Sequence, residues 1–273
     1  MKNAMSIDVE DWFQVENLRP VYPRDTWDAQ ALRVQIGTDK ALEILDEANA
    51  RATFFVLGWV AERCPEVVRA IVAAGHELAS HGYNHDLVYE LGPERFREDV
   101  RRSKSLLEDI GGVEILGYRA PNFSITSESL WAPEILMELG FSYDSSVYPT
   151  SMHDRYGLDD YGDKPFDWPC GLREVPLAVA TIGKSNLPVS GGGYFRLFPY
   201  SLTRAALKGI NRKDTNFTFY LHPWELDPGQ PREKRVRLSH RFRHYVNLKS
   251  TADKLRRLVN DFEFDTIRAA YSL

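Results

Sequence analysis

Cysteine and long apolar runs are both scarce in this sequence. The 273 residues include two cysteines, Cys64 and Cys170, which leaves room for one disulfide at most. The dense disulfide framework of small secreted domains is therefore excluded, and a reducing, cytoplasmic location fits better. No apolar run approaches the roughly 20 residues that span a bilayer, and the first residues, MKNAMSIDVEDWF, lack the apolar core of a secretory signal. We therefore expect no transmembrane segment.

An excess of positive charge is also missing. The chain has 34 Lys and Arg against 39 Asp and Glu, a formal net charge of −5, so the total does not indicate a nucleic-acid partner. Hydrophobic residues make up 43% and charged residues 27%, which is typical of a globular protein and excludes general disorder. Because no repeat or low-complexity linker interrupts the chain, the length allows one large α/β unit.

Strand-like and helix-like segments alternate along the chain. β-branched and aromatic stretches predict strands, and amphipathic stretches that end near glycine predict helices. The expected strands are 4–8, 51–57, 115–119, 141–143, 174–181 and 217–221, and the expected helices are 40–50, 66–74, 93–110, 127–139, 199–209 and 251–262. This order is typical of a parallel sheet with helical crossovers, and the length favours closure as an α/β barrel. We expect the irregular stretch 148–169 to be a loop over one face.

Acidic side chains follow the first predicted strand directly. The sequence Asp8-Val9-Glu10-Asp11 places three carboxylates within four residues, and they repel one another unless a cation lies among them. In an extended segment Asp8 and Glu10 point to the same side, because side chains alternate along a strand. The functional interpretation is a metal or acid–base site, and the alternative is a solvated turn or a helix cap.

Two histidines follow residues 77–80, which we interpret as the end of a further strand. His81 and His85 are four residues apart in Ser-His-Gly-Tyr-Asn-His, a spacing that places both on one face of a helical turn. Two histidines and one carboxylate form an open metal site with positions left for water and substrate. The alternative is a pair of ordinary polar histidines.

Two further polar groups follow predicted strands. Arg119, in Tyr-Arg-Ala-Pro, is suited to hold a carboxylate in bidentate geometry, although a surface ion pair is the commoner use of an isolated arginine. His222 follows the apolar strand 217–221 and is suited to acid–base chemistry, although such a residue is often a core histidine. The remaining histidines carry less weight. We expect His76 to be structural and the others to lie on the surface, namely His153, His240 and His244.

These clusters, in this order, resemble the polysaccharide deacetylase family with the NodB-homology domain, also called carbohydrate esterase family four. The resemblance rests on D-V-E-D, S-H-x3-H after Ala-Gly-His-Glu, R-A-P and L-H-P, and it covers most of the chain. It implies a distorted (β/α) barrel of about seven strands and a divalent metal. The segments SIDVEDWFQV, ASHGYNH, YRAPNFSIT and YDSSVYP look like the cytoplasmic, exopolysaccharide-associated branch found in exosortase-bearing bacteria.

The resemblance implies a role for each matching residue. Asp8 matches the catalytic base, Arg119 the residue that orients it, and His222 the general acid. His81 and His85 match the metal histidines. The substrate-binding positions that it implies are the peptide N–H of Asn122, as an oxyanion donor, and two residues that line the site and tune the acid, Asp144 and Trp224.

Two departures from the family pattern affect the metal ligands. Many relatives have adjacent aspartates, whereas Val9 follows Asp8 here. The D-x-D variant of the family suggests Glu10 as the metal carboxylate, and Asp11 remains a rival. Gly82, after the first metal histidine, stands where many relatives have Ser or Thr, so we expect a hydrogen bond around the metal ligands to be missing or replaced. Zinc is the first choice for this ligand set, and cobalt, nickel, iron and manganese also fit.

The predicted function is metal-dependent removal of the N-acetyl group from an amino sugar in a polysaccharide or its precursor, with release of acetate. A cytoplasmic location favours a nucleotide-activated or lipid-linked glycan as the partner. Two alternatives remain: a hydrolase of another C–N bond or of an O-acetyl ester, and a non-catalytic glycan-binding barrel.

The net charge hides an asymmetry. Residues 232–257 contain ten Lys or Arg and two acids, a balance of +8, which leaves −13 for the rest of the chain. We therefore divide the chain into a deacetylase barrel, 1–231, and a basic C-terminal extension packed on it, 232–273. The ordinary interpretation of this extension is a solvated helix face, and the functional one is contact with an anionic substrate group or a membrane surface.

Overall fold

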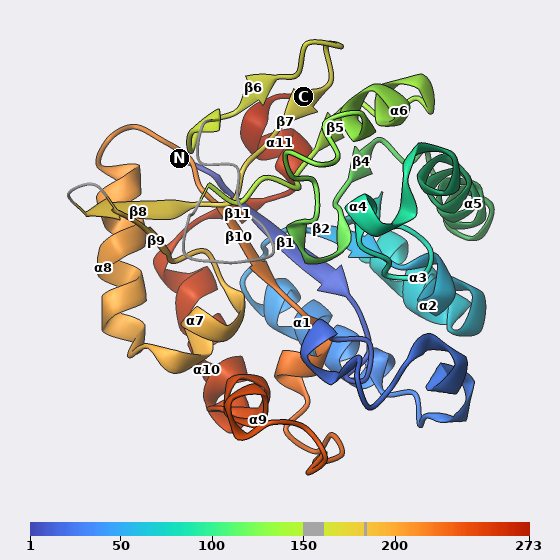
Figure 1. The fold of residues 1–273 in the computed structure, drawn as a ribbon. Helices are drawn as coiled ribbons and strands as arrows, with labels where there is room; N and C mark the ends of the chain where they lie inside the picture. The colour runs from blue at the N-terminus through green and yellow to red at the C-terminus, as the bar shows by residue number, and fades with distance from the viewer. Residues whose placement is uncertain (150–160, 183–184) are drawn as a thin grey trace.

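A curled, largely parallel sheet forms the centre of the molecule (Figure 1). The structure is a computed structural model that describes residues 1–149, 161–182 and 185–273. The strands of the sheet are β1 (Asn3–Val9), β2 (Thr53–Val56), β3 (Glu77–Ser80), β4 (Gly117–Tyr118), β5 (Tyr143–Asp144), β6 (Phe166–Asp167), β7 (Arg173–Glu174), β10 (Thr218–Leu221) and β11 (Phe264–Asp265). All seven residues of β1 are buried, as expected for a parallel strand that is covered on both faces.

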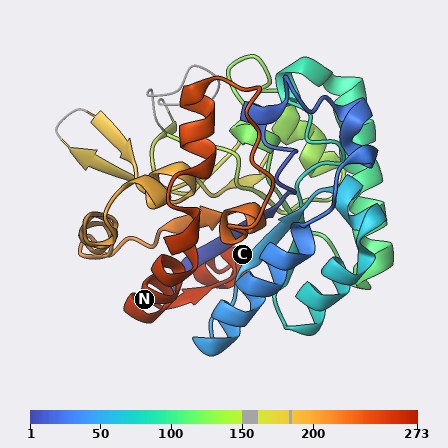
Figure 2. The ribbon, with the colours of Figure 1, turned by 90° about the horizontal axis from the view of Figure 1, so that it is seen from below.

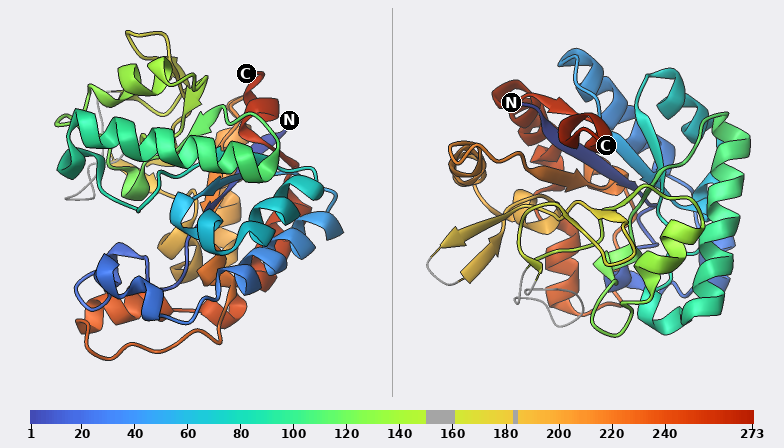
Figure 3. Two further views of the ribbon diagram at one scale, coloured as in Figure 1. Left: turned by 90° about the vertical axis from the view of Figure 1, so that its right-hand side faces the viewer. Right: turned by 90° about the horizontal axis from the view of Figure 1, so that it is seen from above.

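Helices surround the outside of this sheet (Figures 2 and 3). The α-helices are α1 (Val34–Glu47), α2 (Gly58–Arg63), α3 (Pro65–Ala73), α4 (Val88–Leu91), α5 (Pro93–Gly111), α6 (Ala132–Glu138), α7 (Gly192–Leu197), α8 (Tyr200–Asn211), α9 (Leu238–Tyr245), α10 (Leu248–Asp261) and α11 (Ile267–Tyr271). Short 3-10 turns include η1 (Glu16–Leu18), η2 (Arg24–Ala29), η3 (Pro121–Phe123) and η5 (Pro223–Leu226). Within the described residues, no helix is both long and apolar enough to cross a bilayer.

The predicted barrel is confirmed as a curled, incomplete one. Within the described residues, seven parallel strands follow the order β10-β1-β2-β3-β4-β5-β7, with β6 antiparallel beside β7 and β11 beside β1. On the open side, the chain after β7 approaches β10 through a 3.3 Å hydrogen bond from the Ala178 N–H to the Thr218 carbonyl. Gly191 adds an isolated parallel bridge to Tyr220. The gap between β7 and β10, where the sheet fails to close into a barrel, is therefore narrow.

The prediction of one continuous strand over 174–181 is wrong. β7 ends at Glu174, and the chain then continues into β8 (Val179–Ile182), which pairs with β9 (Ser185–Pro188) in a separate hairpin. Val175 and Leu177 donate their N–H groups toward the β5 side, and Pro176 lies at the alternating position that faces β10. Proline has no N–H to give to a ladder. The strand is therefore interrupted where it would have closed the barrel.

Two predicted helices begin at different residues from those expected. The helix predicted over 40–50 starts six residues earlier, at Val34, because a carboxylate distant in the sequence accepts hydrogen bonds from its first N–H groups. The helix predicted over 127–139 starts at Ala132, with Pro133 in its first turn. Proline is tolerated there because the N–H groups of the first turn have no partner inside the helix.

Residues 232–273 pack against the barrel and contribute to its sheet. β11 pairs with β1, and α10 lies against α1, where Arg256 forms ion pairs with Glu43 and Glu47. The basic segment thus has some of its charge neutralised by the barrel. The domain boundary at residue 231 stays a prediction.

Candidate metal and catalytic site

One carboxylate and two histidines form a buried cluster beyond the ends of β1 and β3. The Oε1 atom of Glu10 lies 3.2 Å from His81 Nε2 and 3.0 Å from His85 Nε2. The three candidate ligand atoms lie within 4.8 Å of one another. Burial pushes the pKa of Glu10 upward, but His85, His222 and His81 outweigh it and hold that pKa well below its usual value. The cluster is therefore an anionic oxygen between two imidazole nitrogens.

The backbone around the histidines is not the helical turn that the spacing predicted. Gly82 and His85 have φ values of 73° and 59°, which lie in the left-handed region, and no helix spans these residues. The chain instead leaves β3 at Ser80 and loops back, which brings both imidazole rings to the same point. A Cβ added at Gly82 would lie 3.0 Å from Asp99 Oδ2. Glycine is therefore favoured here by both its φ angle and the space available.

The orientation of His81 fits a metal ligand. Its Nδ1 atom lies 2.8 Å from the carbonyl oxygen of Arg119. A carbonyl only accepts, so Nδ1 carries a hydrogen, and Nε2 is the ring nitrogen that faces Glu10 and is available to a metal. The donor set of one carboxylate and two imidazoles fits a divalent transition metal.

The structure brings Glu10, and not Asp11, together with the histidines. Asp11 Oδ2 accepts the N–H groups of Arg33 at 2.7 Å and Val34 at 2.9 Å, at the first turn of α1. Burial raises the pKa of Asp11 to about 6, against the opposing effect of these hydrogen bonds. Asp11 therefore has the helix-capping role that was the alternative for an acid in this motif.

Asp8 is held by a fully buried arginine. Arg119 Nη1 lies 2.7 Å from Asp8 Oδ1 and 2.7 Å from Ser6 Oγ. Its other nitrogens donate to Ser145, Nε to the carbonyl at 2.9 Å and Nη2 to the hydroxyl at 2.8 Å, and its guanidinium lies over the Phe55 ring. The predicted bidentate contact is therefore wrong, since one nitrogen contacts the carboxylate and the others fix the arginine itself.

His222 lies on the opposite side of the cluster, in a second buried network. Its Nε2 atom is 3.7 Å from Glu10 Oε1, and its Nδ1 atom is 2.8 Å from Glu225 Oε1. The other oxygen of Glu225 accepts from Arg196 Nε at 2.5 Å. Burial lowers the pKa of His222, but Glu10, Glu225 and Asp8 together raise it to about 9. This histidine therefore favours its protonated form.

Glu225 and Arg196 were missed in the sequence. The signal for Glu225 was present, because a glutamate three residues after a residue that starts a helical turn is the mark of a capping box. The structure has this box, with the His222 N–H donating to Glu225 Oε1 at 3.1 Å. Arg196 stands in the segment GGGYFRLF, which has no comparable pattern. Its partner lies 29 residues further along the chain and is unpredictable from local spacing.

Trp224 lines the site as predicted, and a histidine expected on the surface supports it. The Trp224 ring lies between His222, at a centroid distance of 5.4 Å, and His244, at 4.4 Å and nearly parallel. His244 is buried, and burial together with Arg196 lowers its pKa to about 3. Its prediction as a surface residue is therefore wrong, because α9 turns it toward the cavity wall.

The other histidines differ in their placement. His76 is buried and accepts the Ala52 N–H at 3.3 Å, in agreement with its predicted structural role. His240 is half-buried on α9, and His153 lies outside the described residues.

Asn122 and Asp144 occupy different environments. Asn122 lines the cavity with its backbone in the left-handed region, at φ 51°. Asp144 is fully buried and is not among the residues that line it. It pairs with Glu174 across β5 and β7, and burial and then the charge of Glu174 raise its pKa well above the usual value. The structure thus places Asp144 behind Ser145 and Arg119, away from the cavity.

The cavity beside the cluster has a volume of about 460 Å³. One wall comes from the first half of the chain and includes Asp8, Glu10 and Asn122. The other comes from the second half and includes His222, Tyr194 on α7 and Phe242 on α9. The catalytic candidates therefore face a space large enough for a sugar, and both halves of the chain are needed to form it.

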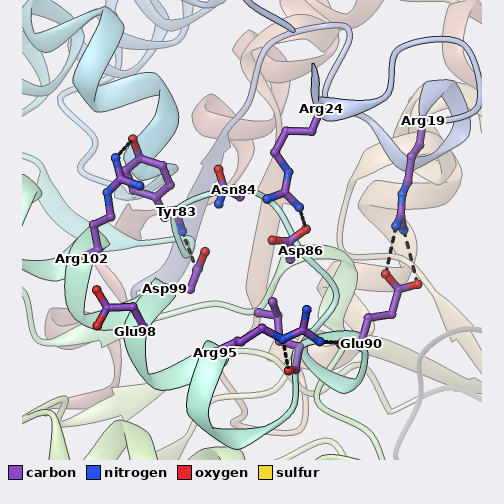
Figure 4. Close-up of a pocket in the computed structure, with 11 residues that line it drawn as sticks. Arg19, Arg24, Tyr83, Asn84, Asp86, Glu90, Arg95, Glu98, Asp99 and Arg102 are labelled. Atoms are coloured by element: carbon purple, nitrogen blue, oxygen red, sulfur yellow. Dashed lines mark hydrogen bonds and ion pairs between the residues drawn. The ribbon is translucent and has the colours of Figure 1, made fainter. Parts of the chain in front are cut away.

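A second cleft, of about 440 Å³, lies behind the loop that carries His85 (Figure 4). Its charged groups largely contact one another, since Arg24 pairs with Asp86 and Arg19 pairs with Glu90. Asp99 accepts the Tyr83 N–H at 2.8 Å, and burial raises its pKa to about 6. These contacts fix the loop between His81 and His85 from its outer side.

Comparison with known proteins assigns the two halves of the chain to different family models. Residues 26–143 match the polysaccharide deacetylase family, and residues 145–272 match a domain of unknown function (DUF3473). The chain is 28% identical over 141 residues to a peptidoglycan deacetylase of Helicobacter pylori, which covers 49% of this chain and 47% of that protein. It is 32% identical over 98 residues to a peptidoglycan-N-acetylglucosamine deacetylase of Bacillus cereus, which covers 36% of each.

The fold agrees with these relatives. A solved structure from Mycobacterium smegmatis, assigned to the polysaccharide deacetylases, superposes with a TM-score of 0.63 at 22% identity and covers 98% of this chain and 88% of that one. The chain therefore shares the curled α/β fold of that structure. Residues 26–143 carry a polysaccharide deacetylase domain. The chain spans half or less of the length of the two curated relatives.

Proposed function

We propose that this protein hydrolyses the N-acetyl group of an amino sugar in a polysaccharide or its precursor and releases acetate. One observation carries the proposal: a single cavity is lined by Glu10 of the buried Glu10, His81 and His85 cluster, by a carboxylate fixed by an arginine, and by a histidine with a raised pKa. General base, metal site and general acid are the three parts that hydrolysis of an unactivated amide requires.

The metal that we propose is zinc, held by Glu10, His81 and His85. A carboxylate with two imidazole nitrogens is a common catalytic zinc set, and it leaves positions for water and substrate. The bound ion would supply Lewis acidity, which lowers the pKa of water and polarises a carbonyl.

Asp8 is the proposed general base. Its carboxylate lines the cavity, and Arg119 Nη1 holds it in place at 2.7 Å. Asp8 would take the proton of the attacking water, and the peptide N–H of Asn122 would stabilise the negative charge that develops on the carbonyl oxygen. Arg119 acts through Asp8 and is a positioning residue.

His222 is the proposed general acid. The Glu225 carboxylate accepts from Nδ1 at 2.8 Å, which keeps the imidazole protonated and directs Nε2 toward Glu10 and the cavity. The protonated ring would give its proton to the leaving amine of the sugar. Trp224 covers the ring from one side and restricts its rotation.

The proposed substrate class is an N-acetylglucosamine-type glycan, since the Bacillus cereus relative is named for N-acetylglucosamine. We further propose that the glycan is carried on a lipid and that the reaction takes place in the cytoplasm. Both cysteines are free thiols, in keeping with a reducing compartment. The assignment to the exopolysaccharide-associated branch rests on sequence motifs and stays a prediction.

Acetate release tests the proposed reaction. The zinc-loaded protein is incubated with N-acetylglucosamine oligomers and, in parallel, with O-acetylated glycans. Release from the N-acetylated oligomers is expected. Release from the O-acetylated glycans alone would establish an esterase instead, and a metal-loaded protein inert on both would favour a glycan-binding barrel.

Two sets of variants test the assigned roles. Asp8→Asn is expected to keep the metal and lose at least about 100-fold in turnover, because the base is removed while the cluster is intact. His81→Ala and His85→Ala are expected to lose the metal, which elemental analysis measures without an activity assay. Wild-type turnover in Asp8→Asn would refute its role as the base.

A further inference from the structure

We propose that α9 docks on an anionic lipid bilayer, with the mouth of the catalytic cavity toward the membrane surface. α9 presents two large apolar side chains to solvent, Leu238 at 78% exposure and Phe242 at 58%. They are four residues apart and therefore share one face of the helix. The helix is held from the other side, where His244 stacks on Trp224. Two adjacent apolar side chains thus project outward from a firmly packed element.

Unpaired cations lie in α9 and in the chain on either side of it. Of the basic residues in 232–257, Arg235 pairs with Glu233 and Arg256 with Glu43 and Glu47. Within the described residues, eight others form no ion pair with an acid. Three of these contact an aromatic ring or backbone carbonyls, namely Arg232, Lys254 and Arg257, and the remaining five are Lys234, Arg237, Arg241, Arg243 and Lys249. Each such cation near an anionic bilayer contributes about 1 kcal/mol of attraction. A solvated helix face explains the cations but not the apolar pair among them.

The combination fits a bilayer better than a protein partner. An interfacial helix places Phe and Leu at the acyl boundary while Lys and Arg contact the headgroups. A stable protein interface buries ~800 Å² on each partner, which two side chains on an eight-residue helix do not supply. An anionic bilayer is therefore favoured as the partner of α9, both by the positive charge and by the small apolar area.

The position of α9 gives the contact a consequence for access to the cavity. Phe242 and Arg243 also line the catalytic cavity, so a bilayer bound to α9 would lie at its mouth. If the proposed deacetylation is correct, this geometry presents the site to a glycan attached to a membrane lipid. The docking itself does not depend on that reaction.

Vesicle sedimentation with the full chain tests the proposal. Vesicles of phosphatidylcholine alone are compared with vesicles containing equal parts of phosphatidylglycerol, each at low and high salt. We expect binding to the anionic vesicles that weakens with salt, and little binding to the neutral ones. Equal binding to both, or none to the anionic vesicles, would overturn the proposal.

Paired variants locate the surface. Leu238→Ser/Phe242→Ser and Arg237→Glu/Arg241→Glu are each expected to weaken binding at least tenfold. Met137→Ser, an exposed apolar position on α6 at the opposite side of the molecule from α9 (Figures 1 and 3), and Arg212→Glu/Lys213→Glu after α8 are the matched controls and should bind like the wild type. Equal losses in the controls would refute the assignment to α9.

Two readouts separate this proposal from its alternatives. Melting temperature and metal content confirm that each variant is folded, and light scattering reports the oligomeric state. Should Leu238→Ser/Phe242→Ser convert a dimer into a monomer, the face would be a contact between copies and the lipid proposal would fail. Vesicle binding by a protein that releases no acetate would refute the proposed reaction and leave the docking intact.

Discussion

Two buried arginines, one on each side of the cavity, fix an ionisable side chain in different ways. Arg119, in the half that matches the deacetylase family, contacts Asp8 directly. Arg196, in the half that matches the second family model, contacts Glu225, and Glu225 in turn contacts His222. The first arrangement fixes the position of a carboxylate, and the second keeps an imidazole protonated through an intermediate carboxylate.

The remaining contacts of the two arginines also differ. Arg119 is fixed by hydroxyls and a carbonyl of Ser6 and Ser145, which belong to β1 and to the chain after β5. Arg196 Nη1 donates to the carbonyls of His244 at 2.7 Å and Val246 at 3.2 Å, at the end of α9. The base is thus anchored to the sheet, whereas the acid is anchored to a peripheral helix. A change at α9 can therefore affect the proposed general acid, His222, through Arg196 and Glu225.

Removing Arg119 should have the largest effect. Arg119→Gln leaves Asp8 buried without its cation, which is expected to cost about 3–5 kcal/mol of stability and at least about 100-fold in turnover. Urea unfolding and acetate release measure the two effects. Arg119→Lys, as a control, keeps the charge but lacks the planar fork, so stability should recover more than activity. Near-wild-type values for Arg119→Gln would show that the ion pair does not position the base.

Removing the Glu225 carboxylate should have a smaller effect that depends on pH. Glu225 is one of the carboxylates that raise the pKa of His222, so Glu225→Gln should lower this pKa and deprotonate the acid at a lower pH. The basic limb of the pH–rate profile of the zinc-loaded enzyme should move to lower pH, with about a tenfold loss in the basic range. The double variant Glu225→Gln/Arg196→Gln controls for the arginine left without a partner. If the basic limb of the profile does not move, Glu225 does not set the pKa of His222, and the proposed role of the Arg196–Glu225–His222 contacts is wrong.

The smallest effect is expected for Asp144, which precedes the serine that holds Arg119. Burial and Glu174 raise the folded-state pKa of Asp144, so its protonated form favours folding. Its stabilising contribution is therefore complete at acid pH and is lost as the pH rises through the raised pKa. Asp144→Asn should reduce the fall in the free energy of unfolding between about pH 5 and about pH 8 by ~1 kcal/mol. Asp167→Asn, on exposed β6, should leave this fall unchanged, and the same slope in both variants would exclude a buried titrating pair.

The sequence was informative wherever the parallel-sheet rule applied. Asp8, His81, Arg119 and His222 each follow a predicted strand, and the carboxyl ends of parallel strands meet at one edge, where the structure indeed brings these residues together. The family to which the first half belongs was likewise predictable from motif order.

Residues that act through distant partners were not predictable. Asp11 caps a helix that begins 23 residues later. Arg196 pairs with the carboxylate of Glu225, which lies 29 residues further along the chain. The loop at His85 needs two left-handed residues, which a histidine spacing does not reveal. In each case the residue's role depends on a tertiary contact, which the local periodicity of the sequence cannot predict.

The position of β1 has a consequence for how the chain acquires its fold. β1 leaves the ribosome first, yet one of its neighbours in the sheet is β10, and 213 residues separate Ser6 from the Phe219 carbonyl that it contacts. At a synthesis rate of about 5–20 residues per second, that edge waits roughly ten seconds or more for its partner. The central strand β1 is therefore paired on one side only until β10 has been made, and the sheet formed by the first half of the chain is completed only when the second half arrives.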